Sequence, residues 1–330
     1  MWQLVFGIAI ACVSMYWAIH GENVSSIYHR IAGANWWLLG VVGAIFMLQQ
    51  VMRSARQMRI IRSTHPQHTF RSSIRILCIS FFFINILPLR MGELMRPLLL
   101  LDEEDLPLGS GFAVVFVERI LDLLSAMIMA ILVISLANIP LLENSWLQTL
   151  RHKLLLFIPL TSLALFLPVF ASDWVIHVCS KTWIPQKIRE LSLSFIEQLS
   201  ALRKTGSLWR IIVETILIWV VSASMYSLAA MAFNINTIGF VESIGLLAFT
   251  MIGMAAPSAP GFAGTYEASF VAGLLLFGCT NNEENFALAF CFHWWIFVVQ
   301  SCSAIFFMVW DKTSFVSLWQ KLRSTRKQNS

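Results

Sequence analysis

The chain has 330 residues, of which 58% are hydrophobic and only 12% charged, and its mean hydropathy is +0.72. This composition excludes an ordinary soluble domain and predicts an all-α polytopic membrane protein. The formal net charge of +5 therefore indicates membrane orientation and lipid headgroups rather than nucleic acid.

The first 75 residues are expected to hold two membrane spans and a basic connection. Residues 2–19 and 36–52 are apolar and uncharged, and a polar loop, residues 20–35, separates them. Segment 53–75 has no acidic residue, and this places it in the cytoplasm. We expect its arginines to be solvated, with contact to anionic lipids as the alternative: Arg53, Arg56, Arg59, Arg62, Arg71 and Arg75.

Residues 76–101 form an apolar run that polar, charged and helix-breaking residues interrupt. Each ionised side chain at bilayer depth costs roughly 2.5–3.5 kcal/mol, so several together need partners or an aqueous cavity. Proline and glycine close together disfavour a continuous helix. We therefore predict a re-entrant helix–break–helix hairpin that enters from the cytoplasm and carries Asn85, Pro88, Arg90, Gly92, Glu93, Arg96 and Pro97.

The remaining segments complete a consistent topology. We expect residues 102–110 and a connector at 171–207 to lie in the cytoplasm. Further full spans are expected at 111–136, 154–170, 209–233 and 286–310. Residues 241–277 predict a second re-entrant hairpin, entered from outside and broken at Pro257, Pro260, Gly261 and Gly264. The prediction is six full spans and two hairpins in a cytoplasmic (inner) membrane, with both termini cytoplasmic because the basic clusters fall on one side.

The two breaks share a spacing that indicates an inverted repeat within a single membrane domain, residues 1–150 against 205–330. Pro88 precedes Gly92 by four residues, as Pro260 precedes Gly264, and a glutamate follows each glycine, Glu93 and Glu267. Corresponding interrupted segments in two halves mark the binding site of many transporters.

A third charged group lies in the span at 111–136. Glu118 and Asp122 share a helix face beside Arg119, and like charges there need a cation; Arg90, Arg96 and Arg119 are the candidates. One interpretation is a structural ion-pair network. The other is that some of these arginines bind an anionic headgroup, because the planar guanidinium matches phosphate oxygens.

The second break offers its own polar groups. Glu267 is either a helix-start carboxylate or a group that couples transport to a proton or cation, and Tyr266 either packs or contacts ligand. No enzyme motif occurs, so we expect no catalytic residue, metal or cofactor. The candidate substrate-binding residues are Asn85, Arg90, Glu93, Arg96, Glu118, Arg119, Asp122, Tyr266 and Glu267.

With these motifs in hand, the chain resembles the lysylphosphatidylglycerol synthase transmembrane-region family of flippase-like proteins. The residues that carry the resemblance are the first break (Asn85, Pro88, Arg90, Gly92, Glu93, Arg96), the Glu118-Arg119-x-x-Asp122 element, and the second break (Pro257, Pro260, Gly261, Gly264, Glu267). The chain departs from the pattern at Phe262-Ala263, where a further small residue is expected. The resemblance implies a stand-alone member without an aminoacyltransferase domain.

The predicted function is translocation of an anionic lipid or lipid-linked headgroup between leaflets, through a charged midplane site between the two hairpins. The expected partners are a phospholipid or isoprenoid-linked lipid, the membrane, and a second copy or an envelope-lipid enzyme, but no nucleic acid. A secondary transporter of a small soluble anion and a lipid-presenting subunit of an envelope-lipid enzyme are the alternatives.

Overall fold

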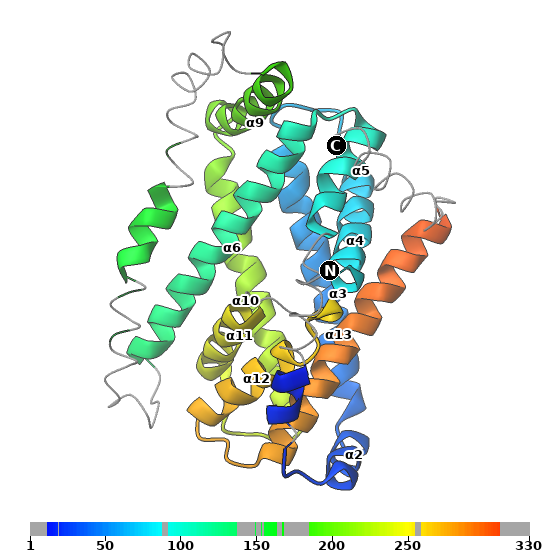
Figure 1. The fold of residues 1–330 in the computed structure, drawn as a ribbon, viewed down its shortest axis with the longest axis vertical. Helices are drawn as coiled ribbons and strands as arrows, with labels where there is room; N and C mark the ends of the chain where they lie inside the picture. Colours follow the sequence, from blue (N-terminus) through cyan, green and yellow to red (C-terminus); the bar gives the residue numbers. More distant parts are fainter. Residues whose placement is uncertain are drawn as a thin grey trace. The chain divides into compact units, whose positions relative to one another are not determined.

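The computed structural model describes residues 12–18, 20–87, 92–136, 149, 153, 155–163, 167, 185–254 and 259–310. Across these residues the regular structure is helical and no strand occurs, which confirms the all-α prediction (Figure 1). The chain forms two compact units: Met1–Gln49, Leu121–Ser162 and Thr215–Val299 make unit 1, while Gln50–Ile120, Leu163–Glu214 and Gln300–Ser330 make unit 2. The units combine segments from both halves of the chain, so the inverted repeat stays a prediction.

Three described helices are long and apolar enough to cross a membrane, by length and composition: α3 (Trp36–Ile61), α10 (Leu208–Ala232) and α13 (Asn282–Trp310). The chain is accordingly an integral membrane protein. Helix α6 (Leu108–Leu136) agrees with the predicted span at 111–136. Of the two predicted spans at 2–19 and 154–170, the structure describes only parts, and the described stretches 12–18 and 155–163 are helical. Six full spans therefore stay a prediction.

The predicted loop at 20–35 is wrong, because it contains helix α2 (Val24–Ala32). Asn23 starts this helix by accepting a hydrogen bond from the Ser25 backbone nitrogen at 2.9 Å, which satisfies one of the donors that a helix start leaves open. Ile27 is buried, whereas Val24 and Tyr28 are exposed.

The predicted end of the second span is also wrong. Helix α3 does not stop at residue 52 but continues to Ile61, and Arg53, Arg56 and Arg59 lie on it. Arg56 is 1% exposed, so it is not a solvated residue. Arg59 donates from Nε to both carboxylate oxygens of Glu214, at 3.0 and 3.2 Å, so it is not simply solvated either.

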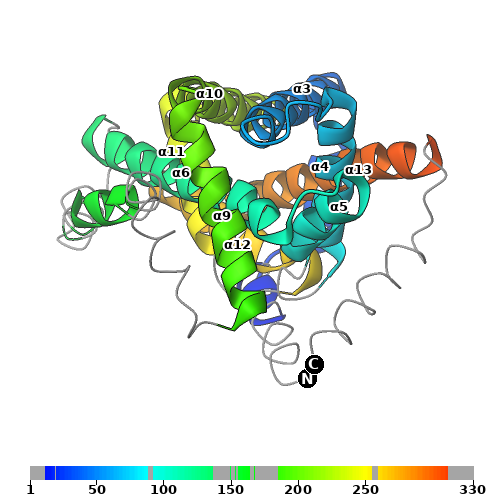
Figure 2. The same cartoon turned by 90° about the horizontal axis from the view of Figure 1, so that it is seen from above.

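The first predicted helix break is confirmed in unit 2. Helix α4 (Phe70–Ile86) ends at Leu87, whose ψ of 137° is extended, as expected of a residue that precedes a proline. After a 3-10 turn at residues 92–94, helix α5 (Met95–Glu104) packs beside α4 (Figures 1 and 2). Helix α9 (Gln186–Lys204) lies within the predicted connector 171–207 and belongs to the same unit.

Gly92 permits this packing. A side chain at this position would overlap the Ile84 backbone nitrogen and the Phe83 carbonyl carbon, so the turn before α5 rests directly on the backbone of α4. The acidic run Asp102–Asp105 lies at the C-terminal end of α5, and Asp105, the residue after the helix, has a left-handed φ of 52°.

The second predicted break is confirmed in unit 1. Helices α11 (Phe240–Met254) and α12 (Thr265–Leu276) pack against each other as an antiparallel hairpin (Figure 1). Small residues permit the close approach: a side chain at Gly273 would meet Leu246, and one at Gly253 would meet Ser269. Between the helices lies the short 3-10 helix η2 (Pro260–Phe262). Re-entry of either hairpin into a bilayer stays a prediction.

Candidate functional site

Arg96, the second residue of α5, lies at the centre of a buried charged group in unit 2. Its side chain is 2% exposed, as is that of Glu118 on α6, and Nη1 of Arg96 donates to Oε2 of Glu118. Nε of Arg96 donates to the Ser80 hydroxyl at 3.3 Å, and the guanidinium lies 5.2 Å from the centre of the Phe81 ring. Two residues of α4 thus help to hold the arginine of α5.

Two more arginines act on the same position. Arg56 of α3 and Arg119 of α6 lie within electrostatic range of Arg96, and we call Arg56, Arg96, Glu118 and Arg119 the Arg96 cluster. Within the part of the chain that is described, Oε1 of Glu118 is buried and accepts no hydrogen bond. Because buried polar atoms are normally hydrogen-bonded, this oxygen retains capacity for a further donor.

The structure brings only some predicted site residues into this cluster. Asn85 lies on the last turn of α4 and Glu93 in the turn before α5, and both are partly exposed. Asp122 is 3% exposed on α6, among the residues of unit 1. Pro88 and Arg90 of the first break and Pro257 of the second fall outside the described residues.

A second polar group lies at the start of α12 in unit 1. Glu267 is 0% exposed; its Oε2 accepts the Gly264 backbone N–H at 2.8 Å, and its Oε1 lies 2.8 Å from Nδ1 of His293 on α13. The Tyr266 ring stacks on the His293 ring with centres 4.2 Å apart. Glu267 is thus a helix-start carboxylate, one of its two predicted interpretations, and it also pairs with a histidine that was not predicted as its partner.

Tyr266 is packed, which is one of its two interpretations from sequence, and its contact with a ligand stays a prediction. It is 7% exposed, and its hydroxyl lies 3.2 Å from that of Tyr226 on α10. Tyr226 in turn stacks against Phe270 with ring centres 5.4 Å apart. The two tyrosines therefore connect α12 with α10 next to the Glu267–His293 contact.

The break before α12 contains three residues with left-handed backbone: Gly261 (φ 70°), Phe262 (φ 58°) and Gly264 (φ 82°). Glycine adopts this region freely, whereas a bulky side chain costs roughly 1–3 kcal/mol there. Phe262 is where the chain departs from the expected small residue, and it adopts the left-handed conformation although a bulky side chain does not favour it.

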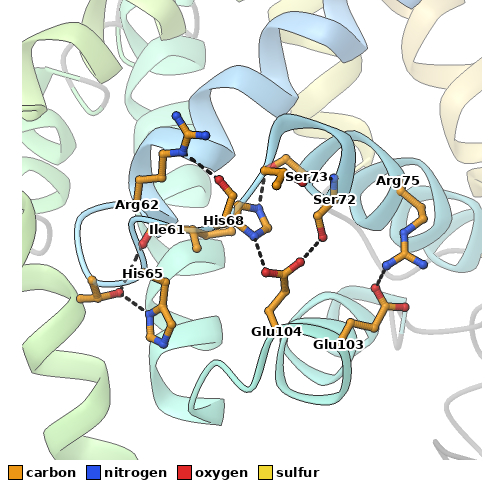
Figure 3. Close-up of polar contacts among 11 residues, drawn as sticks. Ile61, Arg62, His65, His68, Ser72, Ser73, Arg75, Glu103 and Glu104 are labelled. Carbon is orange, nitrogen blue, oxygen red and sulfur yellow. Dashed lines mark hydrogen bonds and ion pairs between the residues drawn. The ribbon is translucent and has the colours of Figure 1, made fainter.

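A third polar network was missed by sequence reasoning (Figure 3). Nδ1 of His68 lies 3.1 Å from Oε2 of Glu104, and its Nε2 lies 2.7 Å from the Ser73 hydroxyl. Ser72 donates to Glu104, and Arg75 pairs with Glu103. These contacts join the connection after α3, the first turns of α4 and the last turn of α5. The sequence signal that could have predicted this network is the opposite charge of two segments, because 53–75 is basic and the run at 102–105 is acidic.

This network holds its two ionisable partners in defined states. Burial lowers the pKa of His68, although the Glu104 carboxylate opposes that effect. For Glu104, burial is the largest single effect and raises the pKa, but the hydrogen bonds from Ser72 and His68, together with the attraction of nearby positive charge including Arg75, outweigh it, so the pKa is lowered. The folded protein therefore favours neutral His68 beside an ionised carboxylate.

Acidification should destabilise the protein through His68. Below about pH 6.5 His68 gains a proton more readily in the unfolded chain than in the folded chain. The free energy of unfolding therefore falls as the pH falls, and protonation of Glu104 lowers it further only at more acidic pH. We expect the apparent melting temperature in detergent to fall between pH 7.5 and 5.5, and His68→Gln to flatten that fall. His65→Gln, a partly exposed histidine in the same connection, is the control; a His68→Gln curve parallel to the wild type would contradict the prediction.

Comparison with known proteins identifies a family. The family model described as "Lysylphosphatidylglycerol synthase TM region" matches residues 4–325. No curated protein and no solved structure matches the chain.

Proposed function

Since the chain belongs to the lysylphosphatidylglycerol synthase TM-region family, and so has a membrane-lipid-related function, we propose that it moves an anionic lipid between the leaflets of the cytoplasmic membrane. The proposed cargo class is a lipid whose headgroup carries phosphate. The two hairpins are proposed to re-enter the membrane from opposite sides, with both termini in the cytoplasm.

Arg96 is the observation that carries this proposal. It lies 2% exposed on the half-helix that follows the first break, in a chain that is 58% hydrophobic. Charged residues inside membrane proteins are costly and mark substrate pathways by default. A broken helix at membrane depth is tolerated where it is buried in protein or lines a cavity, which is the setting that a lipid headgroup requires.

The chemistry of the cluster suits a phosphate. The Arg96 cluster holds three guanidinium groups and one carboxylate, and guanidinium binds phosphate oxygens in a planar, two-pronged geometry. We propose that Arg96 and Arg119 receive the phosphate, together with Arg90 of the first break. Glu118 then balances the cluster when no lipid is bound, while the acyl chains stay in the bilayer.

The test is a reconstituted transport assay with fluorescent NBD-phosphatidylglycerol and NBD-phosphatidylcholine in liposomes. We expect the anionic lipid to move faster, and Arg90→Ala and Arg119→Ala each to slow it roughly tenfold or more, because a charged hydrogen bond contributes about 1.5–3 kcal/mol. Arg210→Ala, at an exposed arginine of α10, is the matched control and should retain full transport.

Arg96→Lys adds a finer test, since lysine keeps the charge but loses the planar fork. It should transport phosphatidylglycerol more slowly than the wild type while unfolding at a similar temperature. Full activity in Arg90→Ala and Arg119→Ala, with folding intact, would reject the proposed function. Loss of wild-type transport on separation from a co-purifying protein would favour a lipid-presenting subunit.

A further inference from the structure

We propose that Glu267 and His293 form a proton-binding site that controls the helix break between α11 and α12. Both residues belong to unit 1, whereas the Arg96 cluster belongs to unit 2. The wider consequence, that a proton gradient drives lipid movement, rests on the proposed function; the binding site itself does not.

The pair is built to hold one proton. A carboxylate only accepts hydrogen bonds, so the 2.8 Å contact with Oε1 of Glu267 makes Nδ1 of His293 the N–H donor. In neutral imidazole the other nitrogen, Nε2, is then the acceptor. A proton from water can bond to Nε2 while Nδ1–H stays on Glu267, and the charge of the pair changes from −1 to 0.

The surroundings favour this change. Glu267 is 0% exposed, so its negative charge is buried in the protein, whereas the His293 side chain is 11% exposed, and we expect the proton to reach the pair from this open side. The stacked Tyr266 ring, 4.2 Å away, presents its face to the imidazole, and aromatic faces attract cations. In the described part of the chain, the other titratable group in contact with the pair is Tyr266 of α12, whose hydroxyl lies 3.2 Å from that of Tyr226 on α10.

A proton fits this pair better than a metal ion. Both Glu267 oxygens already accept hydrogen bonds, from Gly264 and from His293. Among the described residues, no group of three His, Cys, Asp or Glu side chains is placed to hold a metal. The pair therefore offers one open acceptor nitrogen and no coordination shell.

The same carboxylate connects protonation to the break. Its Oε2 accepts the Gly264 N–H at 2.8 Å, directly before α12 and after the left-handed Gly261 and Phe262. A positive His293 attracts the carboxylate and keeps it ionised as a cap for this turn. Without that proton the buried negative charge has a weaker partner, and the turn is held less firmly.

The first measurement uses the full chain in lipid nanodiscs with ¹⁵N-labelled histidine, and His293→Gln assigns the signal. The His293 resonance is followed from pH 8 to pH 5, the range in which histidine acts as a switch, and we expect it to show protonation of Nε2. Hydrogen exchange of residues 259–270, corrected for the intrinsic pH dependence, should slow on protonation with the same midpoint. Glu267→Gln, which removes the charge but keeps an acceptor oxygen, should shift the midpoint to lower pH.

His29→Gln, at an exposed histidine of α2 in the same unit, is the control and should leave both signals unchanged. A His293 resonance that does not titrate in this range would overturn the proposal, as would a titration without any change in exchange at 259–270. Should His293→Gln fail to fold, the midpoint shift in Glu267→Gln shows whether the proton binds beside this carboxylate.

Transport gives the separate readout. In liposomes with an imposed pH gradient, wild-type movement of NBD-phosphatidylglycerol should respond to the gradient, and Glu267→Gln should lose that response. If the wild type moves no lipid, the proposed function fails, whereas the titration and exchange still decide the proton site. If the wild type moves lipid but the pH gradient does not change the rate, the proposed coupling of proton binding to lipid transport is wrong.

Discussion

Arg96→Met should lower the free energy of unfolding by about 3–5 kcal/mol, because it leaves the Glu118 carboxylate charged in a buried site. Both side chains are 2% exposed, so water cannot replace the lost partner. Glu118→Leu should be destabilising for the same reason, since Arg96 is then left without its carboxylate. Unfolding in mixed micelles with increasing sodium dodecyl sulfate, followed by circular dichroism, measures both changes.

The double variant Arg96→Met/Glu118→Leu should recover most of this stability. Replacing a whole buried ion pair with apolar residues of similar size is often neutral or stabilising, and the double-variant cycle isolates the interaction between the two residues. Transport of NBD-phosphatidylglycerol should not recover, because the proposed phosphate-binding guanidinium is absent. Recovery of both stability and transport would mean that the cluster is a structural ion-pair network only.

The Arg59–Glu214 pair is the matched control. Its side chains are 31% and 21% exposed, and ion pairs with access to solvent contribute about 0–1 kcal/mol. Arg59→Met should therefore destabilise much less than Arg96→Met and leave transport intact. An equal loss in both variants would show that burial does not set the energetics of these pairs.

The helix breaks could be predicted from sequence because their causes are local. Proline fixes its own backbone and restricts the residue before it, and Leu87 has the extended ψ of 137° that this restriction demands. Glycine at Gly92 and Gly264 then accommodates close approach or left-handed backbone. One ion pair of the site, Arg96 with Glu118, was also among the predicted pairings.

The end of α3 could not be predicted, since a hydropathy pattern marks where charge begins rather than where helical hydrogen bonds stop. Arginine, glutamine and methionine are good helix formers, and these residues fill the turns up to Ile61. The burial of Arg56, which is 1% exposed, depends on tertiary packing that a local window does not contain.

The Glu267–His293 contact was missed for a related reason. The two residues are 26 positions apart on different helices, and no spacing rule connects them. A lone histidine within an apolar helix is usually an ordinary packed residue, so only the placement of α12 against α13 shows the carboxylate beside it. A helix-start carboxylate could be predicted at Glu267, and the structure adds its partner.

Gly92→Ala should destabilise the hairpin of α4 and α5 by about 3 kcal/mol, the upper end of the usual cost of overpacking. The added methyl group would overlap the Ile84 backbone nitrogen and the Phe83 carbonyl carbon. Backbone atoms cannot rotate away as side-chain ends do, so α5 must separate from α4. Arg96 lies one helical turn beyond Gly92, and this displacement should also weaken its bond to Ser80 and slow lipid transport.

Gly40→Ala is the control that separates the backbone overlap at Gly92 from the general effect on stability of replacing a glycine in or beside a helix. Nothing lies within 4 Å of a side chain built at Gly40 on α3, and alanine in a helix interior is favoured over glycine by about 1 kcal/mol. Gly40→Ala should therefore be neutral or stabilising in the same unfolding titration, while Gly92→Ala unfolds at lower detergent concentration. Equal stability of Gly92→Ala and the wild type would mean that α5 does not rest on the backbone of α4, and the position of Arg96 beside Ser80 would lose its structural basis.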